Sequence, residues 1–409
     1  MVNVAIMGHG VVGSGVAEIL INHRDRVSEK AKNEINVKYI LDLRDFDGLP
    51  YSDKFIKDFN VIVNDPEVQV VVEVMGGCTF AYNYVKACLL AGKSVCSSNK
   101  ELVAQKGAEL LKIAAEKNVN FLFEASVGGG IPVLRPMAQC LTANEITEVT
   151  GILNGTTNFI LTKMVTENMD FADALKLAQE LGYAEKDPTA DIEGLDACRK
   201  ICILASLGFG VHVYPDQVKP EGITKISPLD VESADALGYV IKLIGKTRKL
   251  DNGQITATVY PALVSRENML SGVNDVFNAI MVRGDEVGDV MFYGRGAGKF
   301  PTASAVVGDV IDCVKHLAAR KYLFWEDGRE NYVADPMNDI TKLYIRAEYE
   351  DEDSAVEEIN ALFEADDIVI NDQAKQLSFI TEFDIEAKLR EDISKLKTVK
   401  PVSIIHAID

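Results

Sequence analysis

The segment from Leu181 to Lys200 gathers carboxylates ahead of an arginine–lysine pair. It reads LGYAEKDPTADIEGLDACRK, and its acidic residues are Glu185, Asp187, Asp191, Glu193 and Asp196. We expect Gly182 and Tyr183 to end one helix and a new helix to begin near Asp191. Asp196 and Lys200, four residues apart, would then share a face. A surface ion pair contributing about 0.3–0.5 kcal/mol explains the same spacing.

The residues after Lys200 favour burial of that helix. They read ICILASLG, which is apolar, and buried charges need partners or a ligand. A lysine held among carboxylates in a cleft can exchange a proton with a substrate hydroxyl. The segment therefore predicts a site for a small cationic substrate with a lysine at its reacting centre.

A glycine loop lies near the N-terminus, at Gly8-His9-Gly10-Val11-Val12-Gly13. It follows an apolar strand expected over residues 2–7 and opens a helix expected from Val11 to about Ile21. Gly8 suits a tight turn, Gly10 lets the backbone approach a pyrophosphate, and Gly13 lets helix pack on strand. An ordinary strand–helix turn is the alternative, but this context favours a dinucleotide site. With the acidic segment, it predicts a dehydrogenase acting on an amino acid.

Asp42 and Arg44 follow the second expected strand. An acidic residue there binds the ribose hydroxyls of NAD, whereas an arginine accepts the 2′-phosphate of NADP. Both are present, so NAD(H) stays open, although Arg44 favours NADP(H). A surface ion pair of Arg44 with Asp42 or Asp45 is an equally simple interpretation.

Two further strand ends carry small or polar residues. Gly76-Gly77 ends one strand, and Ser97-Ser98-Asn99-Lys100 ends the next. The carboxyl ends of strands face the ligand crevice in this architecture. We therefore expect Lys100 to point towards cofactor and substrate, with an ordinary solvated charge as the alternative.

Two more motifs have both a functional and a structural interpretation. In Glu124-Ala-Ser-Val-Gly-Gly-Gly130, carbonyl oxygens and the carboxylate could ligate a hard cation, but the residues alone favour a domain hinge. In Asn154-Gly-Thr-Thr-Asn158, hydroxyl and amide groups at a helix N-terminus suit a substrate carboxylate. Helix capping explains part of that second motif.

Alternating strands and helices predict a Rossmann-type, doubly wound parallel sheet in the first part of the chain. Further strands are expected at 37–42, 70–75, 94–97 and 120–124, with helices at 81–91 and 106–116. From about Pro132 the pattern predicts a mixed α+β substrate and oligomerisation domain. Its expected strands are 148–153, 255–264, 279–282 and 287–293, and its expected helices are 158–181, 191–208 and 230–246.

The C-terminal part carries two further patterns. A second glycine-rich loop, Gly294 to Gly298, leads through Pro301 into a helix expected to reach about Arg320 and to pack on the first domain. After a linker marked by Asp327-Gly328 and Asp335-Pro336, we expect a ferredoxin-like βαββαβ order. Its strands and helices are 342–348, 354–363, 367–371, 377–383, 385–396 and 401–407.

Composition restricts the class of protein. The 409 residues are 47% hydrophobic and 25% charged, which is typical of globular proteins. A net charge of −20 argues against nucleic-acid binding. No apolar run approaches the ~18 residues of a membrane span. Seven cysteines without metal-type spacing predict reduced, mostly buried thiols in the cytoplasm. The five histidines form no convincing triad.

The sequence resembles homoserine dehydrogenases over about residues 3–325. Three motifs carry the resemblance: GHGVVGSG, GILNGTTNFIL and LGYAEKDPTADIEGLDACRK. The run GRGAGKFPTASAVVGD is similar to the family's second cofactor-side glycine loop, which includes Gly296 and Gly298. The resemblance implies NAD(P)-dependent interconversion of L-homoserine and L-aspartate 4-semialdehyde, on the route to threonine, methionine and isoleucine.

The resemblance also implies roles for individual residues. Lys200 is the expected general acid/base, Lys100 would orient substrate or share that role, and Asp196 would lie near the reacting hydroxyl. The expected substrate-binding residues are Glu185, Asp191, Gly182, Tyr183, Asn154 and Thr156. The expected cofactor-binding residues are Gly8, Gly10, Val11, Val12, Gly13, Arg44, Gly76, Gly77, Ser98, Lys100, Gly296 and Gly298. A structural Na⁺ would be held at Glu124, Val127, Gly129 and Ile131, which replaces the hinge interpretation.

Residues 340–409 resemble the regulatory ACT-type domain that many members carry. The first turn, Tyr349-Glu-Asp-Glu-Asp353, lacks the usual Pro-Gly of the effector loop, so effector binding is left open and oligomerisation is the alternative role. We predict a dinucleotide-binding domain over 1–132 with 300–325, a substrate domain over 133–299, and a homodimer or homotetramer. Another amino-acid dehydrogenase and a dinucleotide-sensing regulator are the alternative functions.

Overall fold

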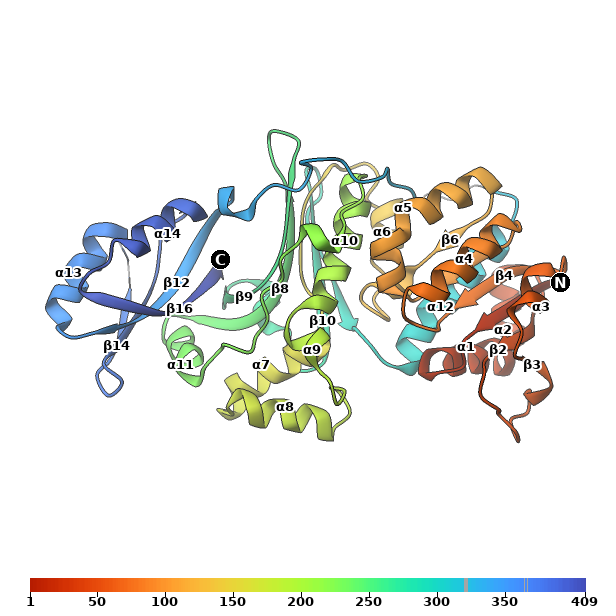
Figure 1. The fold of residues 1–409 in the computed structure, drawn as a ribbon, viewed down its shortest axis with the longest axis horizontal. Helices are drawn as coiled ribbons and strands as arrows, with labels where there is room; N and C mark the ends of the chain where they lie inside the picture. The colour runs from red at the N-terminus through yellow and green to blue at the C-terminus, as the bar shows by residue number, and fades with distance from the viewer. Residues whose placement is uncertain (320–322, 364, 366) are drawn as a thin grey trace. The chain divides into compact units, whose positions relative to one another are not determined.

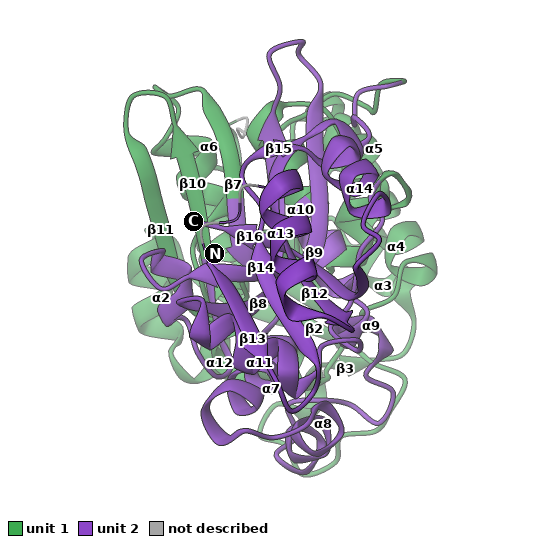
Figure 2. Ribbon diagram, turned by 90° about the vertical axis from the view of Figure 1, so that its left-hand side faces the viewer, with its two compact units in different colours: residues 1–149, 202–217, 280–330 green, residues 150–201, 218–279, 331–409 purple. Residues whose placement is uncertain are grey.

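The computed structural model describes residues 1–319, 323–363, 365 and 367–409. The chain divides into two compact units (Figure 2). Unit 1 comprises residues 1–149, 202–217 and 280–330; unit 2 comprises residues 150–201, 218–279 and 331–409. Among the described residues, no helix combines the length and the apolar character that crossing a bilayer requires.

Unit 1 contains a six-stranded parallel sheet, which confirms the Rossmann-type fold. The strand order is β3-β2-β1-β4-β5-β6. The strands are β1 (Val2–Met7), β2 (Ile35–Leu41), β3 (Phe55–Ile56), β4 (Val68–Glu73), β5 (Ser94–Ser97) and β6 (Phe121–Leu122). The helices of this region are α1 (Val11–Asn22), α2 (Arg24–Ala31), α3 (Phe59–Asn64), α4 (Thr79–Leu90), α5 (Lys100–Lys117) and α6 (Leu134–Gln139). Buried strands β1 and β4 read as nearly continuous apolar runs, as expected for a sheet covered on both faces.

The helix after the second glycine-rich loop, α12 (Lys299–Lys315), packs in the core of unit 1. Its buried side chains recur at helical spacing and join those of α1 and the central strands. They are Ala303, Val306, Val307, Val310, Cys313 and Val314. This confirms the predicted packing of the helix on the first domain. The helix ends before Arg320, a residue outside the described ones, as are Lys321 and Tyr322 of the predicted range 300–325.

The sheet of unit 2 has the order β8-β9-β16-β12-β14-β13, and Figure 1 labels all of these strands except β13. Its strands are β8 (Tyr239–Lys249), β9 (Ile255–Ser265), β16 (Val399–Ile408), β12 (Ile340–Tyr349), β14 (Gln376–Ile380) and β13 (Ile368–Asn371), and β15 (Asp384–Ile385) pairs with β12. Strands β7 (Ile146–Ile152) and β10 (Phe277–Gly284) belong partly to each unit, and β11 (Gly288–Arg295) belongs to unit 1.

The C-terminal strands confirm the predicted ferredoxin-like order. In chain order the four strands are β12, β13, β14 and β16, and their spatial order is β16-β12-β14-β13. Helices α13 (Glu352–Phe363) and α14 (Glu386–Ser394) share one apolar core with them. Strand β16 also pairs in parallel with β9, from His406 opposite Ala262 to Ile408 opposite Val264. The two compact units do not coincide with the predicted ranges, which were 1–132 with 300–325, 133–299 and 340–409. Residues 364 and 366 of the last range lie outside the described residues.

The remaining helices correct three predictions. The range 158–181 holds two helices, α7 (Gly155–Glu167) and α8 (Phe171–Glu180), and 191–208 holds α9 (Thr189–Ile192) and α10 (Leu195–Phe209). The prediction of a helix over 230–246 is wrong in its second half, because α11 (Pro228–Ala236) gives way to strand β8. The residues that separate these elements have left-handed backbone: Asn168 (φ 52°), Gly194 (φ 76°) and Gly238 (φ 84°).

Several short elements differ from the predicted ones. The predicted strand 120–124 is shortened to β6 and is followed by a 3₁₀ helix over Glu124–Ser126. The other 3₁₀ helices of the described residues are Ser52–Lys54, Pro215–Gln217, Met269–Gly272 and Pro336–Asn338. The sequence did not predict α2, α3, α6, β3 or β15. All seven cysteines are free thiols and five are buried, but Cys140 is exposed and Cys78 is half-buried.

Candidate functional site

The glycine loop between β1 and α1 has a geometry that admits only glycine at two positions. Gly8 has φ 100°, in the left-handed region. A Cβ on Gly13 would lie 2.0 Å from the carbonyl oxygen of Gly8. A Cβ on Gly10 would meet no atom within 4 Å, so that side of the loop is open. A pyrophosphate can therefore approach the N-terminus of α1, where Val11 and Val12 begin the helix.

Asp42, after β2, joins this loop to Arg44. Its carboxylate accepts hydrogen bonds from the backbone N–H of His9 (2.8 Å), from Arg44 Nε (3.0 Å) and from Arg44 Nη2 (2.9 Å). The hydrogen bond from the Arg44 side chain is the main reason that the pKa of Asp42 lies well below its usual range. Arg44 thus pairs with Asp42 and not with Asp45, which pairs with Lys57. The exposed guanidinium also lies 5.1 Å from the Phe46 ring centroid.

A buried carboxylate that the sequence analysis missed shapes the ends of β4 and β5. Glu73 is fully buried and accepts hydrogen bonds from Ser97 Oγ (2.6 Å) and from the Met75 N–H (2.9 Å). Burial raises the pKa of this carboxyl, while the hydrogen bond from Ser97 acts in the opposite direction. A lone acidic residue ending the apolar run VQVVVE was the available signal.

The same network places Lys100. The Ser97 hydroxyl accepts from the Asn99 N–H (3.0 Å), and the Asn99 amide donates to the Gly77 carbonyl (2.6 Å). Asn99 also caps α5 by accepting from the Leu102 N–H, so Lys100 is the first residue of that helix. Gly76 and Gly77, both with positive φ, form the facing turn, and the Ser98 N–H donates to the Glu73 carbonyl. These predicted cofactor residues therefore belong to two loops of unit 1 that hydrogen bonds join.

The second glycine-rich loop contacts the turn after Glu124. A Cβ on Gly129 would lie 2.3 Å from the Gly296 carbonyl oxygen, and the Gly130 N–H donates to the Arg295 carbonyl (3.2 Å). Gly298, with φ 127°, is the N-cap of α12. The two loops are therefore packed backbone against backbone, which a side chain at Gly129 would prevent.

Glu124 connects that turn to the start of α6 by hydrogen bonds. Its buried carboxylate accepts the N–H groups of Val133 (2.6 Å), Leu134 (2.9 Å) and Arg135 (2.8 Å), at the start of α6. The Glu124 N–H donates to Asp309 of α12, whose other oxygen pairs with Arg135. Burial, and then the Glu124 charge, raise the pKa of Asp309 to about 7.

Carbonyl oxygens are the available cation ligands at this turn. The described residues contain no group of three or more His, Cys, Asp and Glu side chains placed to hold a metal. Val127, Gly129 and Ile131 are buried, and within the described part of the chain their carbonyl oxygens accept no hydrogen bond. Such oxygens suit a hard cation of low charge.

Lys200 and Asp196 form a buried ion pair within unit 2. Lys200 Nζ lies 2.6 Å from Asp196 Oδ2 and donates to the Leu153 carbonyl at 2.7 Å. The side chains are only 10% and 4% exposed, respectively. The two residues, predicted to share a helix face at i,i+4 spacing, therefore form a buried ion pair and not a solvated surface pair. Such a lysine is held in one position beside a carboxylate.

Asn154 connects this pair to the preceding helix. Its amide nitrogen donates to Asp196 Oδ2 (2.9 Å) and to Asp191 Oδ1 (2.7 Å) on α9. Asp191 and Asp196 thus lie on different helices, because Gly194 separates α9 from α10. The structure brings together four of the predicted residues: Asn154, Asp191, Asp196 and Lys200.

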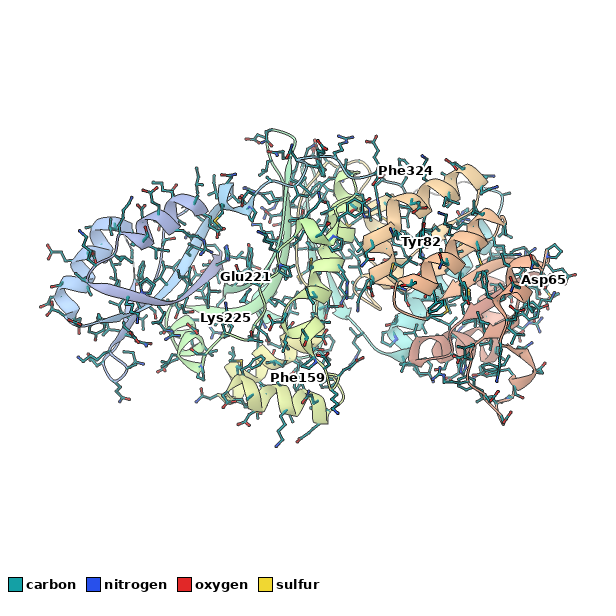
Figure 3. All side chains as sticks on the ribbon, in the orientation of Figure 1. Asp65, Tyr82, Phe159, Glu221, Lys225 and Phe324 are labelled. Carbon is teal, nitrogen blue, oxygen red and sulfur yellow. The ribbon has the colours of Figure 1, made fainter. Side chains whose placement is uncertain are left out.

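The other predicted substrate residues lie around the start of α7. Thr156 Oγ1 donates to the Tyr183 carbonyl at 2.7 Å, and the Tyr183 ring packs at 5.0 Å, edge to face, on Phe159, which is labelled in Figure 3. Gly182, with φ 75°, makes the turn after α8. Glu185 is exposed, and within the described part of the chain its carboxylate makes no hydrogen bond or ion pair.

A second buried lysine, also missed by the sequence analysis, supports α7. Lys242 of β8 donates to the Val273 carbonyl (2.6 Å), to Asn274 Oδ1 (3.0 Å) and to Asn158 Oδ1 (3.3 Å). Burial lowers the pKa of Lys242 to about 8. A lone lysine within the apolar strand YVIKLIG was its signal. Lys242 therefore fixes the NGTTN helix against the sheet of unit 2.

Comparisons with known proteins agree on one family. Two family models match: "Homoserine dehydrogenase" over residues 132–311, and "Homoserine dehydrogenase, NAD binding domain" over residues 8–124. The homoserine dehydrogenase of Bacillus subtilis (strain 168) is 40% identical over 369 residues, which are 88% of this chain and 84% of that protein. A homoserine dehydrogenase structure from Thiobacillus denitrificans has a TM-score of 0.90 and 34% identity, covering 100% of this chain and 98% of its own. A hyperthermophilic archaeal homoserine dehydrogenase in complex with NADPH has a TM-score of 0.65 and 29% identity, covering 79% of this chain and 99% of its own.

Proposed function

The chain belongs to the homoserine dehydrogenase family of oxidoreductases, with a nicotinamide-cofactor domain, and from this premise we propose which residues perform the reaction. The reaction is the interconversion of L-homoserine and L-aspartate 4-semialdehyde. The buried contact of Lys200 with Asp196 is the single observation that carries the proposal. It supplies one fixed proton donor and acceptor in a chain that belongs to a hydride-transferring family.

Lys200 moves the proton in this proposal. In the oxidation direction, Lys200 Nζ accepts the proton of the homoserine hydroxyl while the carbon-bound hydrogen leaves as hydride; in reduction it returns the proton to the forming alcohol. When bound, the nicotinamide cofactor accepts or supplies that hydride. Asp196 holds the amine in place, and the burial of both side chains excludes water from the pair.

Substrate binding uses the remaining predicted residues. Asp191 and Glu185 hold the substrate ammonium by charge, and Lys100 at the start of α5 orients the substrate. Thr156 and the turn at Gly182 and Tyr183 shape the site. The exposed Glu185 carboxylate is available to a cationic ligand.

The experiment that tests this function is oxidation of L-homoserine with NADP⁺ and with NAD⁺, followed at 340 nm at alkaline pH. Turnover with homoserine and none with aspartate or malate supports the proposed substrate. Turnover only with another amino acid supports the alternative dehydrogenase. Cofactor binding without any turnover would support the dinucleotide-sensing regulator instead.

We propose NADP(H) as the preferred cofactor, with NAD(H) as the weaker one. The Arg44 guanidinium is exposed, held by Asp42, and still has N–H groups to offer a 2′-phosphate. Arg44→Ala should therefore raise the KM for NADP⁺ about ten- to a hundredfold, which corresponds to loss of a charged hydrogen bond, and leave the KM for NAD⁺ nearly unchanged. Lys57→Ala, at an exposed lysine paired with Asp45, is the control. Equal weakening of both cofactors would remove the 2′-phosphate argument.

We also propose that Na⁺ binds the backbone of the turn that contains Glu124, Val127, Gly129 and Ile131. The backbone carbonyls of the last three residues support this site. The Glu124 carboxylate, which accepts three N–H groups at the start of α6, holds the turn in place. A cation that binds only the folded protein stabilises it, by about 2.7 kcal/mol at a free concentration 100 times its Kd. We expect Tm to rise with NaCl relative to choline chloride at matched ionic strength. Identical melting curves in both salts would contradict the site.

We propose a cytoplasmic homodimer or homotetramer, in which residues 340–409 form an ACT-like domain. The ferredoxin-like strand order supports the ACT-like domain, and the seven free thiols support a reducing compartment. The acidic turn Tyr349–Asp353 leaves oligomerisation as the simpler role of that domain.

A further inference from the structure

Asn154 uses its whole hydrogen-bonding capacity on other protein groups. Its two amide hydrogens point to Asp191 Oδ1 and Asp196 Oδ2. Its oxygen accepts from the Thr157 N–H (2.9 Å) and from Thr157 Oγ1 (3.1 Å). A primary amide offers two donors and one oxygen with two lone pairs. The residue is only 5% exposed, and its side chain therefore has no hydrogen-bonding group left for a substrate.

The contacts fix the orientation of this amide from both ends. The Thr157 backbone N–H is only a donor, so it requires the oxygen of Asn154 on its side. Ionised carboxylates are only acceptors, so Asp191 and Asp196 require the nitrogen on theirs. An amide rotated by half a turn would lose the cap of α7 and face two carboxylates with an oxygen. The assignment of nitrogen and oxygen is thus determined by the neighbours.

The amide nitrogen of Asn154 donates to two carboxylates beside Lys200. Asp191 Oδ1 and Asp196 Oδ2 both bond to Asn154 Nδ2, so the two carboxylates lie within a few ångströms of each other. Like charges at that distance oppose each other's ionisation. The amide hydrogens offset this repulsion without adding charge, because each donates to one carboxylate. Asp196 Oδ2 can then accept from Lys200 as well.

Asn154 also connects three helices at their ends. It is the N-cap of α7, Asp191 lies on the one-turn helix α9, and Asp196 lies in the first turn of α10. The residue before it, Leu153, offers the carbonyl that receives Lys200 Nζ. Residues 153 and 154 therefore contact both partners of the ion pair.

We propose that Asn154 is a positioning residue that sets the geometry and protonation of the Asp191, Asp196 and Lys200 cluster, and that it does not bind the substrate. The inference rests on the proposed function for its activity test, and it revises the role expected for Asn154. An uncharged donor is required at this position. A serine keeps the helix cap but supplies no second donor, and an aspartate keeps the cap but adds a third carboxylate.

The test compares Asn154→Asp and Asn154→Ser with the wild-type full chain. Asn168→Asp, at the exposed C-cap of the same helix α7, is the matched control for the chemical change. In the aspartate variant the added charge favours the protonated lysine, so the pH–rate profile of homoserine oxidation should move to higher pH by about one unit or more. In the serine variant kcat should fall about tenfold or more, with the KM for the cofactor unchanged. The control should keep the wild-type profile.

Two results would overturn the inference. Wild-type kcat and an unmoved pH–rate profile in both variants would leave Asn154 as a helix cap only. A raised KM for homoserine, with kcat and pH profile unchanged, would make it a substrate ligand.

A second measurement needs no turnover, so it separates this inference from the proposed function. Asn154→Ser is combined with the double variant Asp196→Asn/Lys200→Met, and Tm is measured for each protein. If Asn154 acts on the ion pair, the serine change lowers Tm less when the pair is absent. Additive losses of Tm would mean a cap only and would contradict the inference. A wild-type protein without homoserine turnover would refute the function but leave this result standing.

Discussion

Lys200→Met is expected to lower kcat for homoserine oxidation by about 10²–10⁴-fold, the usual contribution of general acid–base catalysis. Methionine keeps most of the side-chain volume but cannot accept the hydroxyl proton. The Kd for NADPH, measured by fluorescence titration, should stay near the wild-type value, because the contacts of Lys200 with Asp196 and Leu153 lie within unit 2, whereas the glycine loop from Gly8 to Gly13 belongs to unit 1. Arg24→Met, at an exposed ion pair on α2, is the control.

Folding has to be monitored in the same variant, because the substitution leaves the buried Asp196 carboxylate without its lysine partner. Removing one partner of a buried ion pair typically costs about 3–5 kcal/mol. The double variant Asp196→Asn/Lys200→Met removes both charges and should recover much of the lost Tm while staying inactive. A single variant that folds and keeps more than a tenth of the wild-type kcat would show that another group moves the proton.

Replacing two glycines of the same loop by alanine should affect different properties: protein stability for Gly13 and cofactor affinity for Gly10. Gly13→Ala places a Cβ about 2.0 Å from the Gly8 carbonyl, so strand and helix have to move apart, at about 1–3 kcal/mol for overpacking. Gly10→Ala meets no atom within 4 Å and has φ −78°, so the protein alone should accept it. Its methyl group instead occupies the space through which a pyrophosphate approaches.

Melting curves and cofactor titrations of the two variants separate these effects. Gly10→Ala should keep the wild-type Tm and raise the Kd for NADPH at least about tenfold, the loss expected for one or two backbone hydrogen bonds to a phosphate. Gly13→Ala should lower Tm even without cofactor. Wild-type cofactor affinity in Gly10→Ala would refute the dinucleotide role of this loop.

Local patterns were sufficient for most of the sheet in unit 1. The predicted strand 94–97 agrees with β5 at both ends, and 2–7 agrees with β1. Buried parallel strands are short apolar runs with turn residues at their ends, and that signal lies within a few neighbouring residues. The same signal failed at 230–246, where apolar residues and two lysines in YVIKLIGK fit either a helix or a strand. Pairing with β9 decided in favour of a strand.

The sequence also located the chemistry correctly but not its contacts. The motif at 181–200 identified Asp191, Asp196 and Lys200, because their types and spacing are local properties. It placed both aspartates on one helix, whereas Gly194 puts them on two. Arg44 had two candidate partners one and two residues away, and only the turn after β2, with Asp42 bonded to the His9 N–H, selects Asp42.

By itself, the sequence determined the Rossmann-type sheet, the glycine loop and the family, since each depends on residues that are close neighbours in the chain. Tertiary structure decided which polar groups meet. Glu73 and Ser97 are 24 residues apart, and Asn154 is 37 and 42 residues from Asp191 and Asp196. A buried carboxylate or amide needs a partner, but its own type does not say which distant donor will supply it. Only the packing of helices and strands brings those donors within reach.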